Sequence, residues 1–273
     1  SFNNFSIQNI FNKEAYQPLP MGDGQKFSLR AQASTYYQTY SASLVEPWLG
    51  GKKPVQFSFS FSHSIQYLYN YSTRGADVDK DRRFLITGGS IGLAKRLEKP
   101  DNYFQLSHAI SFQHFDLKNY NVGLFTFGNG SAENLAYTIG ISRNEGDVNP
   151  IFPRSGSKFN LTAKLTPPYS AWNGTDYKEL ADQRAEAVDN NDSEAIAKID
   201  QERFNWLEYY KIKFEGQWFT QLVGKFVLSS KAEFGFLGAY NNDRGIPPFD
   251  RFFLGGDGLG GYALDGREVI RLR

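Results

Sequence analysis

The chain has 273 residues, enough to bury a substantial core in one large domain or two small ones. Its formal net charge of +1, from 30 basic and 29 acidic residues, gives no general attraction to nucleic acid or to acidic substrates. Cysteine is absent, which excludes disulfides, thiolate metal sites and a cysteine nucleophile. Aromatic residues make up 16% of the chain, although the mean hydropathy is −0.49. No apolar run approaches the roughly 18 residues of a transmembrane helix, but strands can cross a membrane without one.

The aromatic residues alternate with small polar residues. Between 55 and 71 the odd positions are aromatic, aliphatic or His, and the even positions are mostly Ser, Gln and Asn. Because successive side chains of a strand point to opposite faces, this pattern predicts a long strand with one apolar and one polar face. The same pattern predicts about ten strands in all. They lie near residues 2–9, 26–35, 37–46, 55–70, 83–95, 103–117, 133–143, 157–167, 206–221 and 226–240.

Two all-β folds show such alternation, the soluble β-sandwich and the transmembrane β-barrel. The barrel is favoured because several strands exceed the usual soluble length of about 5–6 residues and aromatic residues gather toward strand ends. Lys158, Lys164 and Glu233 fall on the polar faces of their strands, which requires a wet interior. The sequence therefore predicts an antiparallel transmembrane β-barrel.

Compact turns alternate with long polar connections, as on the two rims of an outer-membrane barrel. The stretch 10–25 is an exception, because it is long where a compact turn is expected. The connection 170–204 predicts two helices, Tyr177–Asp189 and Ser193–Phe204, with Asp192 or Ser193 as the N-cap of the second. This helical insertion in an extracellular loop is either a solvated projection or a surface for a partner.

No cofactor or catalytic site is expected. His108 and His114 lie about 20 Å apart along one strand, too far to share a metal, and His63 is on another strand. Residues 256–261 match G-x-G-x-x-G but lack the preceding strand and following helix of a dinucleotide site. No Ser–His–Asp arrangement, carboxylate pair or basic stripe stands out. We expect neither enzymatic activity nor nucleic-acid binding.

Four segments, in this order, carry a resemblance to a known family. Two are compact turns, one built on Pro47 and Trp48 and the other on Phe152, Pro153 and Gly156. The other two are the segment 248–256, of sequence PFDRFFLGG, and the final Leu-Arg pair at 272–273. These segments resemble the BamA family of outer-membrane protein assembly factors, which is related to the mitochondrial sorting and chloroplast import barrels. At residue 154 this chain has Arg where the family has threonine.

The resemblance covers residues 1–273 and implies one partial barrel domain, with about ten of sixteen strands. By the family order these are the second to the eleventh strand, followed at 241–273 by the start of the sixth extracellular loop. The periplasmic POTRA domains of the family are not expected within this chain.

The resemblance also implies a function. Such a barrel is an insertase that folds β-barrel proteins into the outer membrane of Gram-negative bacteria, by opening sideways and adding strands at its seam. Its partners would be unfolded β-barrel substrates, accessory lipoproteins of an assembly complex and the lipid bilayer, and no cofactor would be needed. The alternative is a passive, porin-like channel, and a soluble β-sandwich for adhesion or glycan binding is a third class.

The resemblance implies two sets of site residues. In the sixth loop, Gly255 and Gly256 would let the loop bend inside the lumen, and Arg267, Arg271 and Arg273 would supply its charged contacts. Arg273 is assigned as the loop-tip arginine in preference to residues 260–262, which lack an arginine. The periplasmic turn residues Pro47, Trp48, Phe152, Pro153 and Gly156 would be structural.

Overall fold

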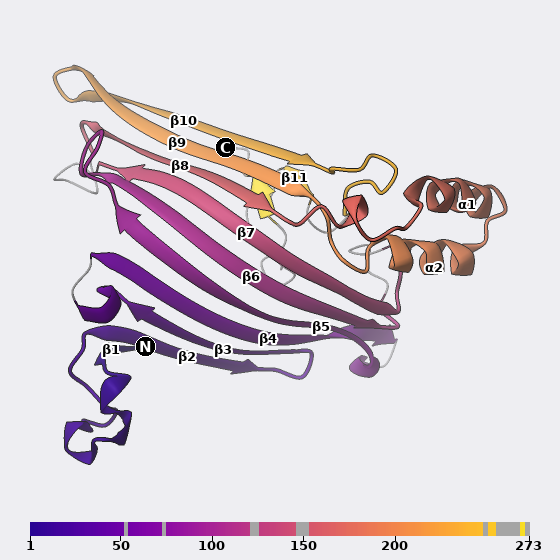
Figure 1. Ribbon diagram of the computed structural model, residues 1–273, viewed down its shortest axis with the longest axis horizontal. Helices are drawn as coiled ribbons and strands as arrows, with labels where there is room; N and C mark the ends of the chain where they lie inside the picture. Colours follow the sequence, from indigo (N-terminus) through magenta and orange to yellow (C-terminus); the bar gives the residue numbers. More distant parts are fainter. Residues whose placement is uncertain are drawn as a thin grey trace. The chain divides into compact units, whose positions relative to one another are not determined.

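The computed structural model describes residues 1–51, 54–72, 75–120, 126–145, 153–247, 251–254 and 268–270. Its main sheet has ten strands, each paired with its neighbour in sequence (Figure 1). The strands are β1 (Phe2–Phe5), β2 (Gln25–Ala33), β3 (Tyr37–Glu46), β4 (Val55–Ser72), β5 (Gly75–Arg96), β6 (Phe104–Lys118), β7 (Gly130–Asn144), β8 (Gly156–Leu165), β9 (Tyr210–Val223) and β10 (Phe226–Gly238). The strand pairs whose register is described are antiparallel in this sheet.

Short elements connect or follow these strands. Two short strands pair in parallel, β11 (Phe252–Leu254) with β12 (Glu268–Ile270). The helices are η1 (Gln8–Phe11), η2 (Lys13–Ala15), η3 (Leu49–Gly51), η4 (Tyr169–Ala171), α1 (Tyr177–Asp189) and α2 (Ser193–Arg203). The predicted all-β antiparallel fold with a helical insertion is confirmed. None of the helices in the described part of the chain is long and apolar enough to cross a membrane.

The chain forms two compact units. The first comprises Ser1–Ala94, Ala109–Leu135 and Glu179–Leu207. The second comprises Lys95–His108, Ala136–Lys178 and Glu208–Arg273.

In both units one face of the sheet, here called the outer face, is apolar and exposed. In the first unit Leu29, which is 60% exposed, lies in one row with Ala42 and Phe61. In the second unit a row joins Leu161 of β8, Phe214 of β9 and Phe234 of β10, and Phe234 is 66% exposed. An apolar surface this extensive is unfavourable in water and suits lipid.

The three histidines belong to this outer face, and each has a hydrogen-bond partner on the next strand. His63 Nδ1 lies 2.8 Å from Thr87 Oγ1, His108 Nδ1 2.6 Å from Tyr137 Oη, and His114 Nδ1 2.6 Å from Glu133 Oε1. These pairings explain how polar rings are accommodated among apolar side chains. The described residues bring no three potential metal ligands of the His, Cys, Asp or Glu types together.

The opposite face, here called the polar face, carries a small buried core in the first unit. Phe84 of β5 stacks on Phe115 of β6 at 6.2 Å between ring centroids and on Tyr120 at 5.7 Å. All three are nearly inaccessible to solvent, as are Leu117 and Phe127. Aromatic side chains therefore fill part of the face that the sequence predicts to be uniformly polar.

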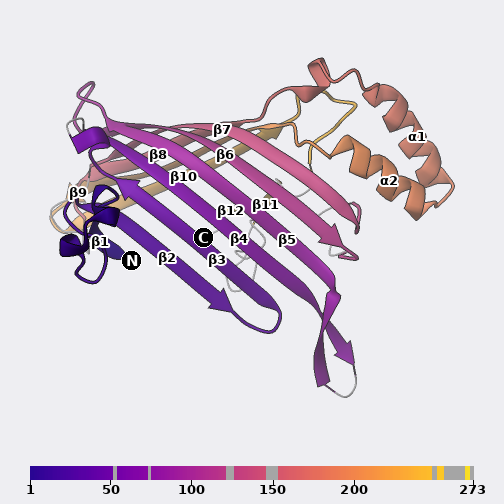
Figure 2. The same cartoon turned by 60° about the horizontal axis from the view of Figure 1, so that its bottom comes forward.

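Three strand boundaries differ from the prediction by four residues or more. Strand β5 begins at Gly75 and not near 83, and its charged first half contacts the end of β6, where Lys118 Nζ lies 3.8 Å from Asp81 Oδ1. With 22 residues, β5 is about 70 Å long, whereas a membrane crossing needs only about 9–11 residues. Figure 2 shows β4 and β5 continuing together past the end of β3.

The other two differences lie at loops. Strand β1 ends at Phe5 because the backbone N–H of Ser6 turns to the carbonyl of Pro20, at 2.9 Å. Strand β9 begins at Tyr210 and not at 206, because the chain before it bonds to β7 instead, where the backbone N–H of Leu207 donates to the carbonyl of Glu133 at 2.8 Å.

Candidate functional site

The polar face of β8, β9 and β10 carries charged side chains, as the sequence predicts. Lys164 of β8 and Lys211 of β9 are direct cross-strand neighbours. Further along β9, Lys213 Nζ lies 2.6 Å from Glu215 Oε1. Charged residues at this density need water or paired partners, because an isolated charge in an apolar medium is very costly. The other members of the set are Lys158, Lys231 and Glu233, of which the last two form an ion pair.

Both neighbouring lysines lie against aromatic rings. Lys164 Nζ is 5.3 Å from the ring centroid of Tyr209, and Lys211 Nζ is 4.4 Å from that of Phe252. Cations at these distances are attracted by the negative ring face. Phe252 is the first residue of β11, so the polar face of β9 holds the beginning of the segment that the sequence assigns to the sixth loop.

The predicted loop residues Gly255, Gly256, Arg267, Arg271 and Arg273 lie outside the described residues. Their contacts and the role of Arg273 therefore stay predictions. Strand β11 ends just before Gly255, and strand β12 begins just after Arg267. The two strands are paired in register, from Phe252 with Glu268 to Leu254 with Ile270.

The predicted turn residues occupy compact connections. Trp48 follows Pro47 after β3, is 54% exposed, and donates its backbone N–H to Glu46 Oε1 at 2.8 Å. Gly156 opens β8 with a φ of 105°, a conformation that disfavours residues with a side chain and explains the glycine. Pro153 is half-buried in the same connection, and Phe152 lies outside the described residues. The structural role assigned to these residues stays a prediction.

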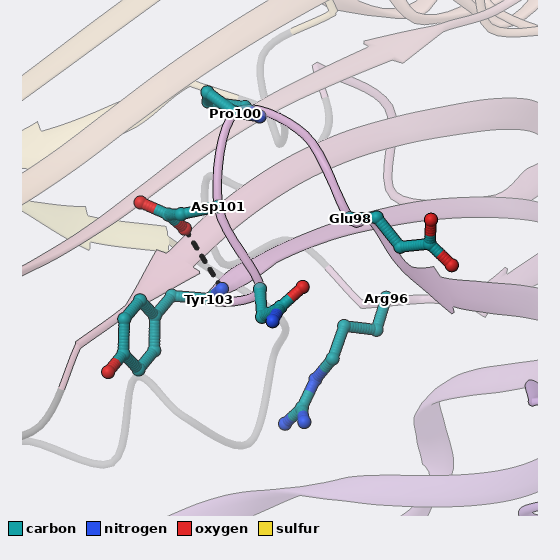
Figure 3. A pocket seen from close by; sticks show the side chains of 6 residues that line it. Arg96, Glu98, Pro100, Asp101 and Tyr103 are labelled. Carbon is teal, nitrogen blue, oxygen red and sulfur yellow. Dashed lines mark hydrogen bonds between the residues drawn. The ribbon is translucent and has the colours of Figure 1, made fainter.

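A residue that sequence reasoning missed joins two compact connections. Arg143 lies near the end of β7. Its Nη2 is 2.9 Å from Asp101 Oδ2, its Nη1 is 2.7 Å from Glu145 Oε2, and it also donates a hydrogen bond to Ser157. The β5–β6 connection, which carries Asp101, borders an open pocket of about 490 Å³. This pocket is lined by Arg96, Glu98, Pro100, Asp101, Asn102 and Tyr103 (Figure 3). Asp101 Oδ1 accepts the backbone N–H of Tyr103 at 2.9 Å. Both carboxylate oxygens of Asp101 are thus used to hold the turn.

A second missed residue is Arg244, in the loop that leads from β10 toward β11. Its side chain is 2% exposed. One guanidinium nitrogen, Nη1, donates to Tyr177 Oη at 3.0 Å and to Glu208 Oε2 at 3.1 Å. The guanidinium carbon also lies 4.8 Å from the ring centroid of Tyr177. Burial lowers the pKa of this arginine, and the interactions with Tyr177 and Glu208 oppose that effect.

The carboxylate of Glu208 is held from a third direction. Ser170 donates its backbone N–H to Oε2 and its hydroxyl to Oε1, both at 2.7 Å. Beside it, Tyr169 has a raised pKa, chiefly because its phenol is partly buried, while Arg244 acts in the opposite direction. We call Ser170, Tyr177, Glu208 and Arg244 the Arg244 cluster. It ties together the chain before α1, the chain after α2 and the loop that follows β10.

The two helices of the insertion are joined in turn by a buried carboxylate. Asp200 of α2 is inaccessible, and its Oδ1 accepts from Arg184 Nε of α1 at 2.7 Å. This hydrogen bond raises the pKa of Arg184. The N-cap of α2 is Asp192, whose side chain accepts the backbone N–H groups of Glu194 and Ala195 at 3.1 and 3.0 Å. The prediction of Asp192 as one of two possible caps is thereby resolved.

Comparison with known proteins places this architecture in a family. A search of curated proteins finds no significant match. The family model described as the Omp85 superfamily domain matches residues 21–267, which is most of the chain and agrees with the resemblance to the BamA family. That family comprises outer-membrane β-barrels that insert or transport proteins, and the ten-stranded sheet with its exposed apolar face fits such a barrel. The chain belongs to the Omp85 superfamily.

Proposed function

We propose that this chain is the barrel core of an outer-membrane insertase, which folds β-barrel proteins into the membrane by lateral opening and strand addition. Unfolded β-barrel proteins are its proposed substrates, accessory lipoproteins of an assembly complex its partners, and the outer membrane its location. Support comes from the family match over residues 21–267 and from the motif order that resembles the BamA family. No covalent bond changes in this process, so we propose that the chain is not an enzyme.

The chemistry of the proposed reaction is backbone hydrogen bonding. A strand that enters lipid unpaired leaves its N–H and C=O groups unsatisfied, at a cost of several kcal/mol for each group. An insertase lowers this cost by offering the edge of its own sheet, so that the substrate pairs as it enters.

One observation favours an insertase over a passive channel. The polar face is partly occupied, by the stacked rings of Phe84, Phe115 and Tyr120 in the first unit and by Phe252 against Lys211 in the second. A passive channel needs an open, hydrated interior, whereas a protein that acts at its sheet edge does not.

The test uses the full-length protein, with its accessory partners, reconstituted in liposomes. We expect an unfolded β-barrel substrate to become resistant to heat and protease faster in these liposomes than in empty ones. In the same liposomes small-solute flux should stay near the background. Solute flux without assisted insertion would instead identify a channel.

The loop assignment is tested in the same assay by Arg273→Ala. We expect this substitution to lower the rate of substrate insertion, whereas Lys225→Ala, which alters an exposed cation in the turn between β9 and β10, should leave the rate unchanged. An unchanged rate and unchanged heat-modifiability in Arg273→Ala would remove Arg273 from the site.

A further inference from the structure

The connection between β1 and β2, residues 6–24, is a folded excursion and not a slack loop. It contains η1 and η2, and isolated bridges pair Phe5 with Met21 and Tyr16 with Pro20. The sequence marks only its unusual length for this rim. In the structure it lies beside the end of β2 (Figure 1).

Hydrogen bonds among hydroxyl, amide, carboxylate and backbone groups hold the excursion together. Ser6 is inaccessible to solvent, and its hydroxyl donates to Asp23 Oδ2 at 2.5 Å while accepting the backbone N–H of Asn9 at 3.1 Å. Asn9 Nδ2 donates to the carbonyl of Met21 at 2.9 Å, and Tyr16 Oη to the carbonyl of Ile10 at 2.6 Å. These bonds fix the conformation of the segment without using an apolar core.

The apolar side chains of the excursion are therefore left outside. Phe11 is 96% exposed, Ile7 46%, Tyr16 43% and Ile10 39%. In η1, a 3₁₀ helix with about three residues per turn, Ile7 and Ile10 lie on the same side, and Phe11 follows Ile10 about 120° around the helix axis. An exposed cluster of this kind on a well-ordered segment is typical of an interaction surface.

The excursion is attached to the outer face of the sheet. Gln25 shares its strand side with the exposed Leu29, and its Oε1 accepts the backbone N–H of Ile7 at 3.0 Å. Its Nε2 donates to Glu46 Oε2 at 2.8 Å, and Phe5 stacks on Phe27 of the same side at 4.9 Å. The excursion thus continues the apolar outer face at the end where β3 turns into β4.

The same end carries the marks of a membrane boundary. Trp48 is half exposed in the β3–β4 connection, two residues from Glu46. Aromatic side chains at strand ends are characteristic of the level of the lipid headgroups. Beside the cluster, Lys13 and Glu14 are both exposed, so charged groups of each sign border the apolar side chains.

We propose that residues 6–24 form an interfacial lipid anchor, in which Ile7, Ile10 and Phe11 enter the boundary between headgroups and acyl chains of the leaflet next to the compact turns. The occupant is a phospholipid surface, because the cluster is continuous with the lipid-facing side of the wall. A short amphipathic segment that lies in the plane of the interface likewise turns its apolar side chains toward the acyl chains and its polar groups toward water. The proposal requires membership of the barrel family and does not depend on insertase activity.

The test measures the depth of a label in the membrane. Phe11→Cys in the full-length protein, with any other cysteine replaced, is labelled with an environment-sensitive fluorophore and reconstituted in phosphatidylethanolamine–phosphatidylglycerol vesicles. Phe11 makes almost no contacts, so its replacement should leave folding unchanged, which heat-modifiability verifies. Gln17→Cys, on an exposed polar residue of the same excursion, is the matched control.

We expect the label at residue 11 to emit at shorter wavelength in vesicles and to lose most of its emission to lipids spin-labelled near the headgroup. The label at residue 17 should keep its emission with these lipids and lose it to aqueous iodide. Equal iodide quenching at both positions would overturn the proposal. Protection of residue 11 that appears only with an accessory protein, or a cross-link between two copies through it, would overturn the lipid assignment in favour of a protein surface.

A second variant shows whether the cluster acts as one anchor. Ile10→Ser with Phe11→Ser should expose a label at Ile7→Cys to iodide, although the same label on the otherwise unchanged chain should be shielded, because the labelled residue alone buries too little apolar surface to hold the segment in the interface. Unchanged shielding of residue 7 in that variant would overturn the cooperative anchor.

Discussion

The excursion 6–24 and the helical insertion around α1 and α2 are both long connections, but opposite kinds of interaction hold them. Hydrogen bonds of hydroxyl, amide and backbone groups hold the excursion, as around Ser6, and its most exposed large side chain is the apolar Phe11. Buried ion pairs hold the insertion, at Arg244 with Glu208 and at Arg184 with Asp200, and its exposed side chains are mostly charged. The apolar side chains exposed on the excursion suit a lipid environment, and the charged side chains exposed on the insertion suit water.

The two connections should also differ in how much stability a single substitution removes. A single hydrogen bond contributes about 1 kcal/mol net, and roughly 1.5–3 kcal/mol when a charged group takes part, so the loss of one weakens the excursion only modestly. A buried ion pair contributes little stability compared with an apolar replacement of both partners. Removal of one partner, however, leaves the other charge buried without compensation. The insertion should therefore be the more sensitive of the two to single substitutions.

The largest effect is expected from Glu208→Ala. This substitution leaves Arg244 buried without its carboxylate and should destabilise the base of the insertion by about 3–5 kcal/mol. Limited proteolysis of the insertion at increasing urea concentration measures the loss. Glu202→Ala, at an exposed glutamate of α2, is the control and should stay close to the wild type. Equal proteolysis of the two variants would refute a stabilising role for the Arg244 cluster.

Ser6→Ala should have a smaller effect, about 1 kcal/mol, because it removes the hydroxyl that bridges Asp23 and Asn9 while Asp23 stays exposed to water. Proteolysis within 6–24 is the measurement, and Ser28→Ala on β2 provides a serine outside the excursion. A loss as large as that of Glu208→Ala would break the distinction between anchoring by hydrogen bonds and anchoring by buried ion pairs.

The smallest effect concerns alkaline pH. Burial raises the pKa of Tyr169, so the folded state holds the phenol proton more tightly than the unfolded state does. The resulting stabilisation is fully present below the ordinary tyrosine pKa of about 10 and is lost as the pH rises through the raised value. Proteolysis of the insertion should accelerate over this range, and Tyr169→Phe should flatten the dependence. An identical pH profile in Tyr169→Phe would exclude this tyrosine as the cause.

The alternation of side chains predicts the sheet well because it is a local property. A strand such as β3, predicted at 37–46 and observed at Tyr37–Glu46, needs only its own sequence to show two faces. The helices are predicted for the same reason, since composition and the capping residue Asp192 are encoded within one segment.

The Arg244 cluster could not be predicted in this way. Arg244 is 36 residues from Glu208 and 67 from Tyr177, and only the folded loops bring them together. The early start of β5 was missed because charged residues such as Asp79 and Asp81 are typical of loops, whereas here they lie on a strand that is longer than a membrane crossing needs. The sixth-loop residues come from the family resemblance, and their roles stay predictions.

The three histidines of the outer face restrict the substitutions that relatives of this chain can carry at these positions. Each ring nitrogen depends on one residue of the adjoining strand, as His63 depends on Thr87 and His108 on Tyr137. In lipid a polar group that loses its partner is costly, so neither position can become apolar without the other. Among relatives of this chain, the two members of each pair should change together.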